Sequence, residues 1–406
     1  MPNESSNVRP RRFGPWPSRI GRSVFAAAFL ATLALFAPPL ARKALRVPVC
    51  EIAGKFPAKH LLVELNGGAS RLAGRRLCND RLRYRNGMIG NTYASPRRAI
   101  SKACREVAAE MAFVRQLRAR GVPFLLVLAP CKMSFDGTLF PRGWPGCNPN
   151  EDAQAVVRLL AEEGVAVLDL VPRFAAARQD VDRHFLVTDH HWNVRTALEA
   201  TGAICDRLAD VLGEPALRGN PRLAPAAWKR HVLERGFVGS HGRRTGSLFS
   251  GVEDFEYFLP LFDTQQENEV PGKGKRRTGD FVAAEFNGRY LKPDKREWRW
   301  LAYGGPPAGL RMHRNQTPSV DLRCMVVKDS FGRHPVSFLT TVFREVVEVD
   351  PRLLDRKRTV VGTVDACRPD VVVMIVNTSS VLGGRWLSGL EKGRTESGGG
   401  DAVHVD

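Results

Sequence analysis

Residues 122–129 read Val-Pro-Phe-Leu-Leu-Val-Leu-Ala and are followed by Pro130. A continuous apolar run of this length is typical of a strand that is buried on both faces of a sheet. The preceding segment, 97–120, carries apolar residues at spacings of three and four, and Gly121 follows it. This pattern predicts a helix that ends at the glycine. A helix leading into a doubly buried strand favours an α/β fold.

The alternation of helix and strand continues toward the C-terminus. Helices are predicted over 152–163 and 192–212, and strands over 165–170, 322–327, 346–349 and 371–376. Alternating elements of this kind form a mainly parallel sheet with helices on both faces. We therefore expect a three-layer α/β domain over residues 42–385.

Two regions depart from the alternation. Residues 213–313 are irregular and glycine-rich, and we expect them to form an insertion of loops and short antiparallel strands over one end of the sheet. Residues 386–406 include three consecutive glycines, which is typical of a flexible tail.

An apolar segment lies near the N-terminus. Residues 23–41 carry no charge, and a helix of this length, at 1.5 Å per residue, nearly spans a bilayer core of about 30 Å. The basic segment 1–22 before it favours a cytoplasmic N-terminus, which places the rest of the chain outside the cytoplasm. A cleaved secretory signal is the alternative, because Pro38 and Pro39 interrupt the run. We favour a single-pass signal-anchor because no suitable cleavage site follows.

Composition restricts the possible functions. The 61 Lys and Arg residues outnumber 42 Asp and Glu, giving a net charge of +19. No nucleic-acid-binding module or aromatic-interleaved basic face accompanies this charge, so nucleic acid is not expected as a partner. The eight cysteines show no zinc-ligand spacing. Free thiols and a single bridge between Cys131 and Cys147 both remain open.

Two short segments follow or precede predicted elements at places where α/β enzymes bind ligands. Residues 188–193 read Thr-Asp-His-His-Trp-Asn at the start of a predicted helix, and residues 328–332 read Lys-Asp-Ser-Phe-Gly after a predicted strand. In open α/β sheets ligands bind at the carboxyl ends of strands. We expect both segments to lie near such ends.

These segments contain the parts of a nucleophilic serine site. Ser330 needs a base to accept its proton, His191 is suited to that role near neutral pH, and Asp189 is suited to orient the imidazole. Simpler roles compete with this interpretation: a helix cap for Asp189, a turn position for Ser330 and a surface position for the histidines. A zinc site is disfavoured because adjacent side chains diverge and no third spaced ligand follows.

The sequence also resembles a known family. Asp189-His190-His191-Trp192 matches the signature of the Asp-His-His-Trp proteins, and 327–332 resembles the nucleophile segment of alginate-type polysaccharide O-acetyltransferases of the SGNH-hydrolase-like superfamily. Segments 85–90, 128–132 and 246–255 provide further matches. The resemblance covers roughly residues 60–385, and the Asp and His precede the serine by about 140 residues, as in the alginate-type branch.

The resemblance implies a function. Ser330 would be the nucleophile, His191 the base and Asp189 its orienting carboxylate, with no metal and no bound cofactor. Candidate residues for substrate binding or for an oxyanion hole are Gly332, Lys132, Arg314 and Asn315.

The implied protein is an O-acetyltransferase of the inner membrane with a periplasmic catalytic domain. It would acetylate a cell-surface or exported polysaccharide, with acetyl groups supplied by a multipass membrane O-acyltransferase. A carbohydrate esterase and a catalytically silent glycan-binding or scaffold subunit of a polysaccharide export complex are the alternatives.

Overall fold

The computed structural model describes residues 59–92, 100–135, 137–144, 148–272, 274–355 and 357–383. The predicted anchor 23–41, the basic segment 1–22 and the predicted tail 386–406 lie outside these residues, as does Cys147. Within the described ranges, no helix is both long and apolar enough to cross a bilayer.

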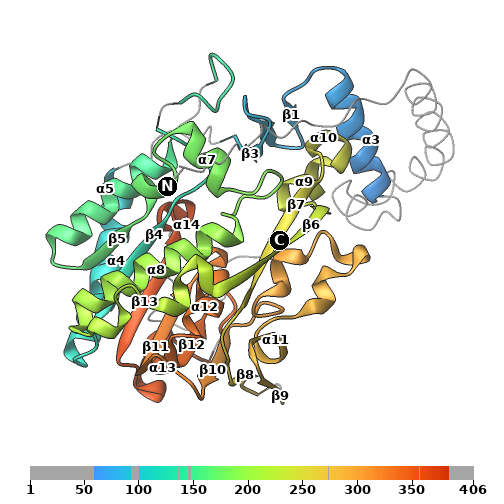
Figure 1. Ribbon diagram of the computed structural model, residues 1–406. Helices are drawn as coiled ribbons and strands as arrows, with labels where there is room; N and C mark the ends of the chain where they lie inside the picture. Colours follow the sequence, from blue (N-terminus) through green and yellow to red (C-terminus); the bar gives the residue numbers. More distant parts are fainter. Residues whose placement is uncertain are drawn as a thin grey trace, which may run out of the picture.

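A central sheet of eight strands organises the molecule, in the order β5-β4-β13-β11-β12-β10-β8-β9 (Figure 1). The strands are β5 (Ala166–Asp169), β4 (Phe124–Ala129), β13 (Val371–Asn377), β11 (Val320–Lys328), β12 (Phe343–Val349), β10 (Leu310–Asn315), β8 (Gln266–Val270) and β9 (Lys275–Gly279). The first five run parallel to one another, and β10, β8 and β9 continue the sheet with antiparallel pairings. The sheet is therefore mixed, with its parallel part formed by the apolar strands.

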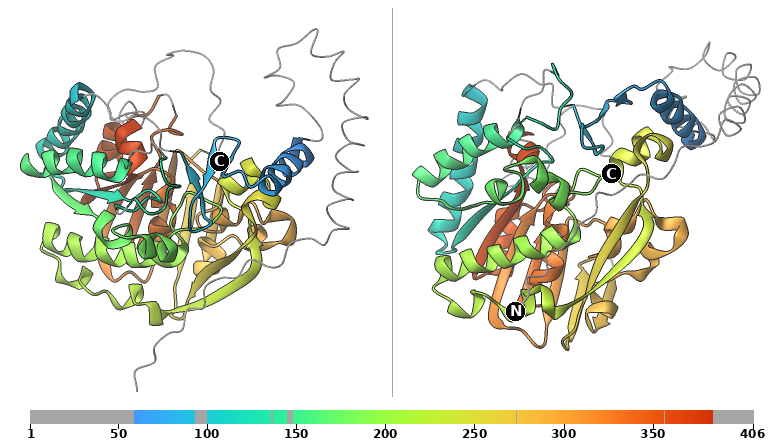
Figure 2. Two further views of the ribbon diagram at one scale, coloured as in Figure 1. Left: turned by 90° about the horizontal axis from the view of Figure 1, so that it is seen from above. Right: turned by 45° about the horizontal axis from the view of Figure 1, so that its top comes forward.

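Helices cover both faces of the parallel part, as Figure 2 shows from above. On one face α14 packs against α5 and α4, and α13 packs against α4; on the other α12 packs against α8. Their bounds are α4 (Ile100–Ala119), α5 (Pro149–Glu162), α8 (Val194–Leu212), α12 (Arg333–Leu339), α13 (Val360–Cys367) and α14 (Thr378–Gly383). The predicted α/β class and the two helical layers are confirmed.

Burial explains why these elements were visible in the sequence. Every residue of β4 and of β13 is buried, because helices cover both faces of these central strands. α4 ends before Gly121, whose φ of +67° lies in the left-handed region that favours glycine. The short helices α6 (Val171–Phe174) and α7 (Arg178–His184) connect β5 to the segment that precedes α8.

The insertion differs from the prediction. It forms an antiparallel ribbon of β6 (Trp228–Phe237) and β7 (Glu253–Pro260), but it also supplies β8, β9 and β10, which extend the central sheet at its edge instead of lying over one end. These edge strands carry opposite charges, as in the ion pairs of Arg276 with Glu267 and Glu269. Charged strands of this kind lack the apolar runs on which the prediction relied. The insertion also contains α9 (Ser240–Thr245), α10 (Ser247–Ser250) and α11 (Phe281–Ala284).

The first described elements pack on the insertion. Helix α3 (Lys59–Leu72) contacts α9 and α10, and a small antiparallel sheet follows it. The Glu64 carboxylate of α3 accepts hydrogen bonds from the N–H groups of Ser247 and Leu248 at the start of α10. The small sheet consists of β1 (Leu77–Cys78), β2 (Arg81–Arg83) and β3 (Ile89–Asn91).

Candidate active site

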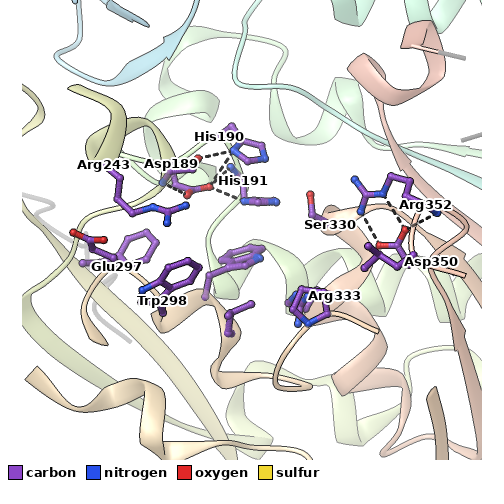
Figure 3. Close-up of a pocket in the computed structure, with 16 residues that line it drawn as sticks. Asp189, His190, His191, Arg243, Glu297, Trp298, Ser330, Arg333, Asp350 and Arg352 are labelled. Carbon is purple, nitrogen blue, oxygen red and sulfur yellow. Dashed lines mark hydrogen bonds and ion pairs between the residues drawn. The ribbon is translucent and has the colours of Figure 1, made fainter. Parts of the chain in front are cut away.

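A cavity of about 260 Å³ opens where β11 and β12 end, and the segment before α8 and part of the insertion complete its walls. Ser330, His191 and Asp189 all line it (Figure 3). Three arginines and three carboxylates also face this space: Arg243, Arg333, Arg352, Asp189, Glu297 and Asp350. The fold thus brings together two segments that are remote in sequence at the edge where α/β sheets bind ligands.

Asp189 orients the ring of His191. Its Oδ1 lies 2.6 Å from Nδ1 of His191 and accepts the backbone N–H of the same residue at 3.0 Å. The helix-cap interpretation of Asp189 is wrong, because α8 is capped by Asn193, whose side chain accepts the N–H of Thr196. The carboxylate is therefore available for the imidazole.

The Asp189 carboxylate is held in its ionised form. Burial alone would raise its pKa, but the neighbouring imidazoles of His191 and His190 and the N–H of Ser240 hold the pKa of Asp189 well below its usual value. Ser240 donates that N–H to Oδ2 at 2.7 Å. Since an ionised carboxylate only accepts hydrogen bonds, Nδ1 of His191 carries the proton of this contact, and Nε2 is the ring nitrogen left for another partner.

Aromatic rings fix the plane of His191. Trp300 stacks on it with ring centroids 4.3 Å apart, and Phe331 packs against it at 4.9 Å. Nε2 of His191 is buried and has no hydrogen-bond partner among the residues the structure describes. A buried polar atom without a partner is costly, and a group bound in the cavity would satisfy it.

Ser330 opens the short 3-10 helix η7 (Ser330–Gly332) directly after β11. The preceding Asp329 caps this turn by accepting the N–H of Phe331 at 2.8 Å, so Ser330 does occupy a turn position. Ser330 is half-buried and lines the cavity. Figure 3 shows its hydroxyl in the space between the ring of His191 and the guanidinium of Arg352.

Phe331 joins the segment of His191 to the turn of Ser330. Its ring contacts His191 and lies 5.4 Å from that of Trp192, which is fully buried. The tryptophan of the Asp-His-His-Trp signature is thus a packing residue that keeps the histidine segment against the serine turn.

Lys132 does not reach the cavity. It is buried, and its Nζ donates to the carbonyl oxygens of Leu186, at 2.8 Å, and of Asp189. Burial lowers its pKa to about 8, although Glu253 and Asp189 oppose this shift. Lys132 is therefore a positioning residue beneath the Asp189 segment instead of a substrate-binding residue.

Three other residues that the sequence analysis proposed for substrate binding do not line the cavity. Gly332 is buried behind the serine, where a Cβ would lie 2.6 Å from Cβ of Lys328, so its small size serves packing. Arg314 pairs with Glu267, and Asn315 ends β10. Because β10 runs antiparallel to β12, its end lies at the opposite edge of the sheet from Ser330.

Sequence reasoning missed several residues of the site. Trp300 belongs to the irregular insertion, where no periodicity marks it. Glu253 accepts the N–H groups of Val187 and Thr188, both at 2.6 Å, and lies within the quoted segment 246–255, so a signal for it existed. Arg352 follows β12 in a stretch that resembles an ordinary basic surface loop.

One group near the cavity has donors suited to a metal ion. Asp189, His190 and His191 each offer one ligand atom, and these atoms lie within 4.8 Å of one another. Two of these residues are joined directly by the hydrogen bond between Nδ1 of His191 and Oδ1 of Asp189, which suits a histidine-carboxylate pair.

Part of the chain matches a known family model. Residues 91–231 match the family model described as the SGNH hydrolase-like domain of acetyltransferase AlgX. The match includes Asp189 and His191 and ends before Ser330. No curated protein matches the chain.

Solved structures show the same fold. PatB1 of Bacillus cereus is 18% identical with a TM-score of 0.60, over 73% of this chain and 95% of that protein. PatB1 with a sulfonyl adduct is 16% identical with a TM-score of 0.61, over 75% and 97% respectively. A DHHW family protein of Eubacterium siraeum DSM 15702 is 16% identical with a TM-score of 0.56, over 77% and 95%. The predicted resemblance to SGNH hydrolase-like acetyltransferases is confirmed.

Proposed function

We propose that this protein is an O-acetyltransferase that moves an acetyl group to hydroxyls of a polysaccharide through an ester on Ser330. The observation that supports this most directly is the orphaned, buried Nε2 of His191 in the cavity that Ser330 lines, with the opposite ring nitrogen bound to Asp189. The match to an acetyltransferase family model supports the acyl group.

The proposed reaction gives each of these groups a role. His191 Nε2 accepts the proton of Ser330 while Oγ forms a bond to the carbonyl carbon of the acetyl donor. The tetrahedral adduct collapses, its bond to the leaving group breaks, and His191 returns the proton to that group. A glycan hydroxyl then attacks the acetyl-serine, gives its proton to His191, and leaves as the acetylated sugar when Ser330 regains a proton. Asp189 stabilises the imidazolium in both halves.

The setting of this reaction is part of the proposal. Residues 23–41 anchor the chain in the inner membrane, and the domain 42–385 acts on the periplasmic side. No bound cofactor takes part, because a multipass membrane O-acyltransferase supplies the acetyl group. The positive charge of the chain, +19, suits an acidic polymer or membrane surface.

Replacement of the nucleophile and the base tests the mechanism. The full chain is purified in detergent and given an activated acetyl ester, and we expect Ser330→Ala and His191→Ala to lose turnover by at least about 10³-fold while circular dichroism stays unchanged. Ser319→Ala is the matched control, because Ser319 is partly buried just before the same strand, at its opposite end. Equal turnover by Ser330→Ala and the wild type would falsify the proposal.

A second measurement separates the alternative functions. Addition of an oligosaccharide acceptor should produce a sugar that is heavier by one acetyl group in mass spectrometry. Acetate without acetylated sugar indicates the esterase. A failure of a fluorophosphonate probe to label Ser330 of the native protein indicates the silent scaffold.

A further inference from the structure

The N–H groups of the two residues that follow Ser330 are already engaged. In acyl transfer the carbonyl oxygen becomes an oxyanion, and N–H groups next to the nucleophile commonly stabilise it. Here the N–H of Phe331 donates to Oδ1 of Asp329 at 2.8 Å, and the N–H of Gly332 donates to the Asp329 carbonyl at 3.3 Å. Arg314 and Asn315 lie at the opposite strand ends, so a side chain that lines the cavity is the candidate for a further donor.

Strand register places Arg352 beside Ser330. β11 and β12 are parallel neighbours, and Val327 pairs with Val349 at their carboxyl ends. Ser330 and Arg352 each follow those residues by three positions, so both lie just beyond the same ends of two neighbouring strands. Both line the cavity, and Figure 3 shows the guanidinium on the side of Ser330 opposite His191.

Asp350 fixes the orientation of this guanidinium. Nε of Arg352 donates to Oδ1 at 2.9 Å and Nη2 donates to Oδ2 at 2.7 Å, a two-bond contact that leaves Nη1 for a ligand. The Arg352 side chain is 37% exposed and that of Asp350 is 2% exposed. The carboxylate of Asp350 is therefore a buried clamp, while the arginine that it holds faces the cavity.

A buried ion network supports the clamp from below. Nζ of Lys328 lies 3.8 Å from Oδ2 of Asp350 and 3.0 Å from Oε1 of Glu348, and all three side chains are buried. Glu348 is paired in turn with Arg311 at 3.2 Å. A donor held in this way does not have to reorganise when charge develops, which is the condition for effective oxyanion stabilisation.

We infer that Nη1 of Arg352 donates a hydrogen bond to the carbonyl oxygen of the acetyl group as that oxygen becomes negative in the tetrahedral adduct. The inference rests on the proposed function, because it concerns the same Ser330 adduct. No proton is transferred in this contact. Arg333 is a weaker choice for the role, since its Nη1 already donates to the carbonyl oxygen of Gly305.

Kinetics of Arg352 variants test the inference. In the full chain we expect Arg352→Ala to lower kcat for an acetyl ester by about 10²–10³-fold with a smaller change in KM, as for the loss of one oxyanion donor. Labelling of Ser330 by a fluorophosphonate, whose tetrahedral adduct carries an equivalent oxygen, should slow by a similar factor. Added guanidinium should restore part of the activity of Arg352→Ala, which a purely structural defect would not show.

Two further variants keep the test decisive. Arg352→Lys retains a cation for Asp350 but not the forked geometry, and it should still lose at least about 30-fold in kcat even if the alanine variant folds poorly. Arg344→Ala is the matched control, because Arg344 lies at the other end of β12, is 42% exposed and is also ion-paired, with Asp321. It should remain within about twofold of the wild type.

The outcomes separate this inference from the proposed function. If the wild type turns over the ester and Ser330 is labelled, but folded Arg352→Lys or Arg352→Ala keeps its kcat within threefold, the inference is refuted and the function stands. Loss of activity without guanidinium rescue of a folded Arg352→Ala also contradicts it. A wild type that neither turns over nor labels refutes the proposed function itself.

Discussion

Gly239→Ala should impair catalysis by displacing Asp189 without touching any reacting group. An added Cβ at this position would lie 2.3 Å from Cβ of Asp189 and 2.6 Å from its Oδ2, whereas ordinary contacts begin near 3.4 Å. The two segments must therefore separate by roughly 1 Å. A misplacement of about 1 Å at a catalytic group costs on the order of 10²-fold in rate. Backbone strain is not involved, because the φ of Gly239 is −76°.

The assay is hydrolysis of an activated acetyl ester by the full chain, with thermal unfolding measured in parallel. We expect kcat to fall about 10²-fold, and the overpacking to cost about 1–3 kcal/mol of stability. Gly202→Ala is the control, since Gly202 lies within α8 and a Cβ there meets nothing within 4 Å. That variant should keep full activity and become slightly more stable. A folded Gly239→Ala with activity within threefold of the wild type would show that the contact with Asp189 does not position the site.

Three other predictions concern single side chains. Asp189→Asn should lower kcat by about 10²–10⁴-fold in the ester assay because an amide cannot hold His191 in the required tautomer, and unchanged kcat would contradict that role. Burial alone would lower the pKa of His313, but Glu285 and Glu348 raise it to about 9. The stabilisation that protonated His313 contributes is therefore complete below pH 6.5 and is lost as pH rises through 9. In denaturant titrations, His313→Gln should not show this loss of stability. Burial raises the pKa of Glu110 to about 8, so the stability of the protein falls as pH rises from 4.5 to 8. Glu110→Met should unfold at a higher temperature than the wild type at pH 8 and at the same temperature as the wild type at pH 4. Equal unfolding temperatures of the two proteins at pH 8 would contradict this prediction.

The parallel part of the fold was predictable because burial leaves a signature in the sequence. Strands such as β4 and β13 are covered on both faces and consist almost entirely of apolar residues. Strands β8 and β9 lie at the edge of the sheet, pair through charged side chains and carry no such signature. Their place in the central sheet became clear only in the structure.

The site was predictable in part for a related reason. Short segments and the family resemblance singled out Ser330, His191 and Asp189, and the structure brings all three to one cavity. Asn315 was misplaced because the side chains of β10 do not reveal whether the strand runs parallel or antiparallel to β12. That direction decides whether the end of β10 lies beside Ser330 or at the opposite strand ends. Lys132 was misjudged because lysine is rarely buried, and only the carbonyl oxygens around it make that position stable.

The cavity has two kinds of wall with different origins in the chain. Ser330 and Arg352 stand at strand ends of the rigid parallel sheet, whereas Trp298, Trp300 and Leu301 come from the insertion. A change confined to the segment of Trp298, Trp300 and Leu301 should therefore reshape this cavity without moving the strand ends that carry Ser330 and Arg352. The architecture thus separates the contour of the chamber from the groups at its floor.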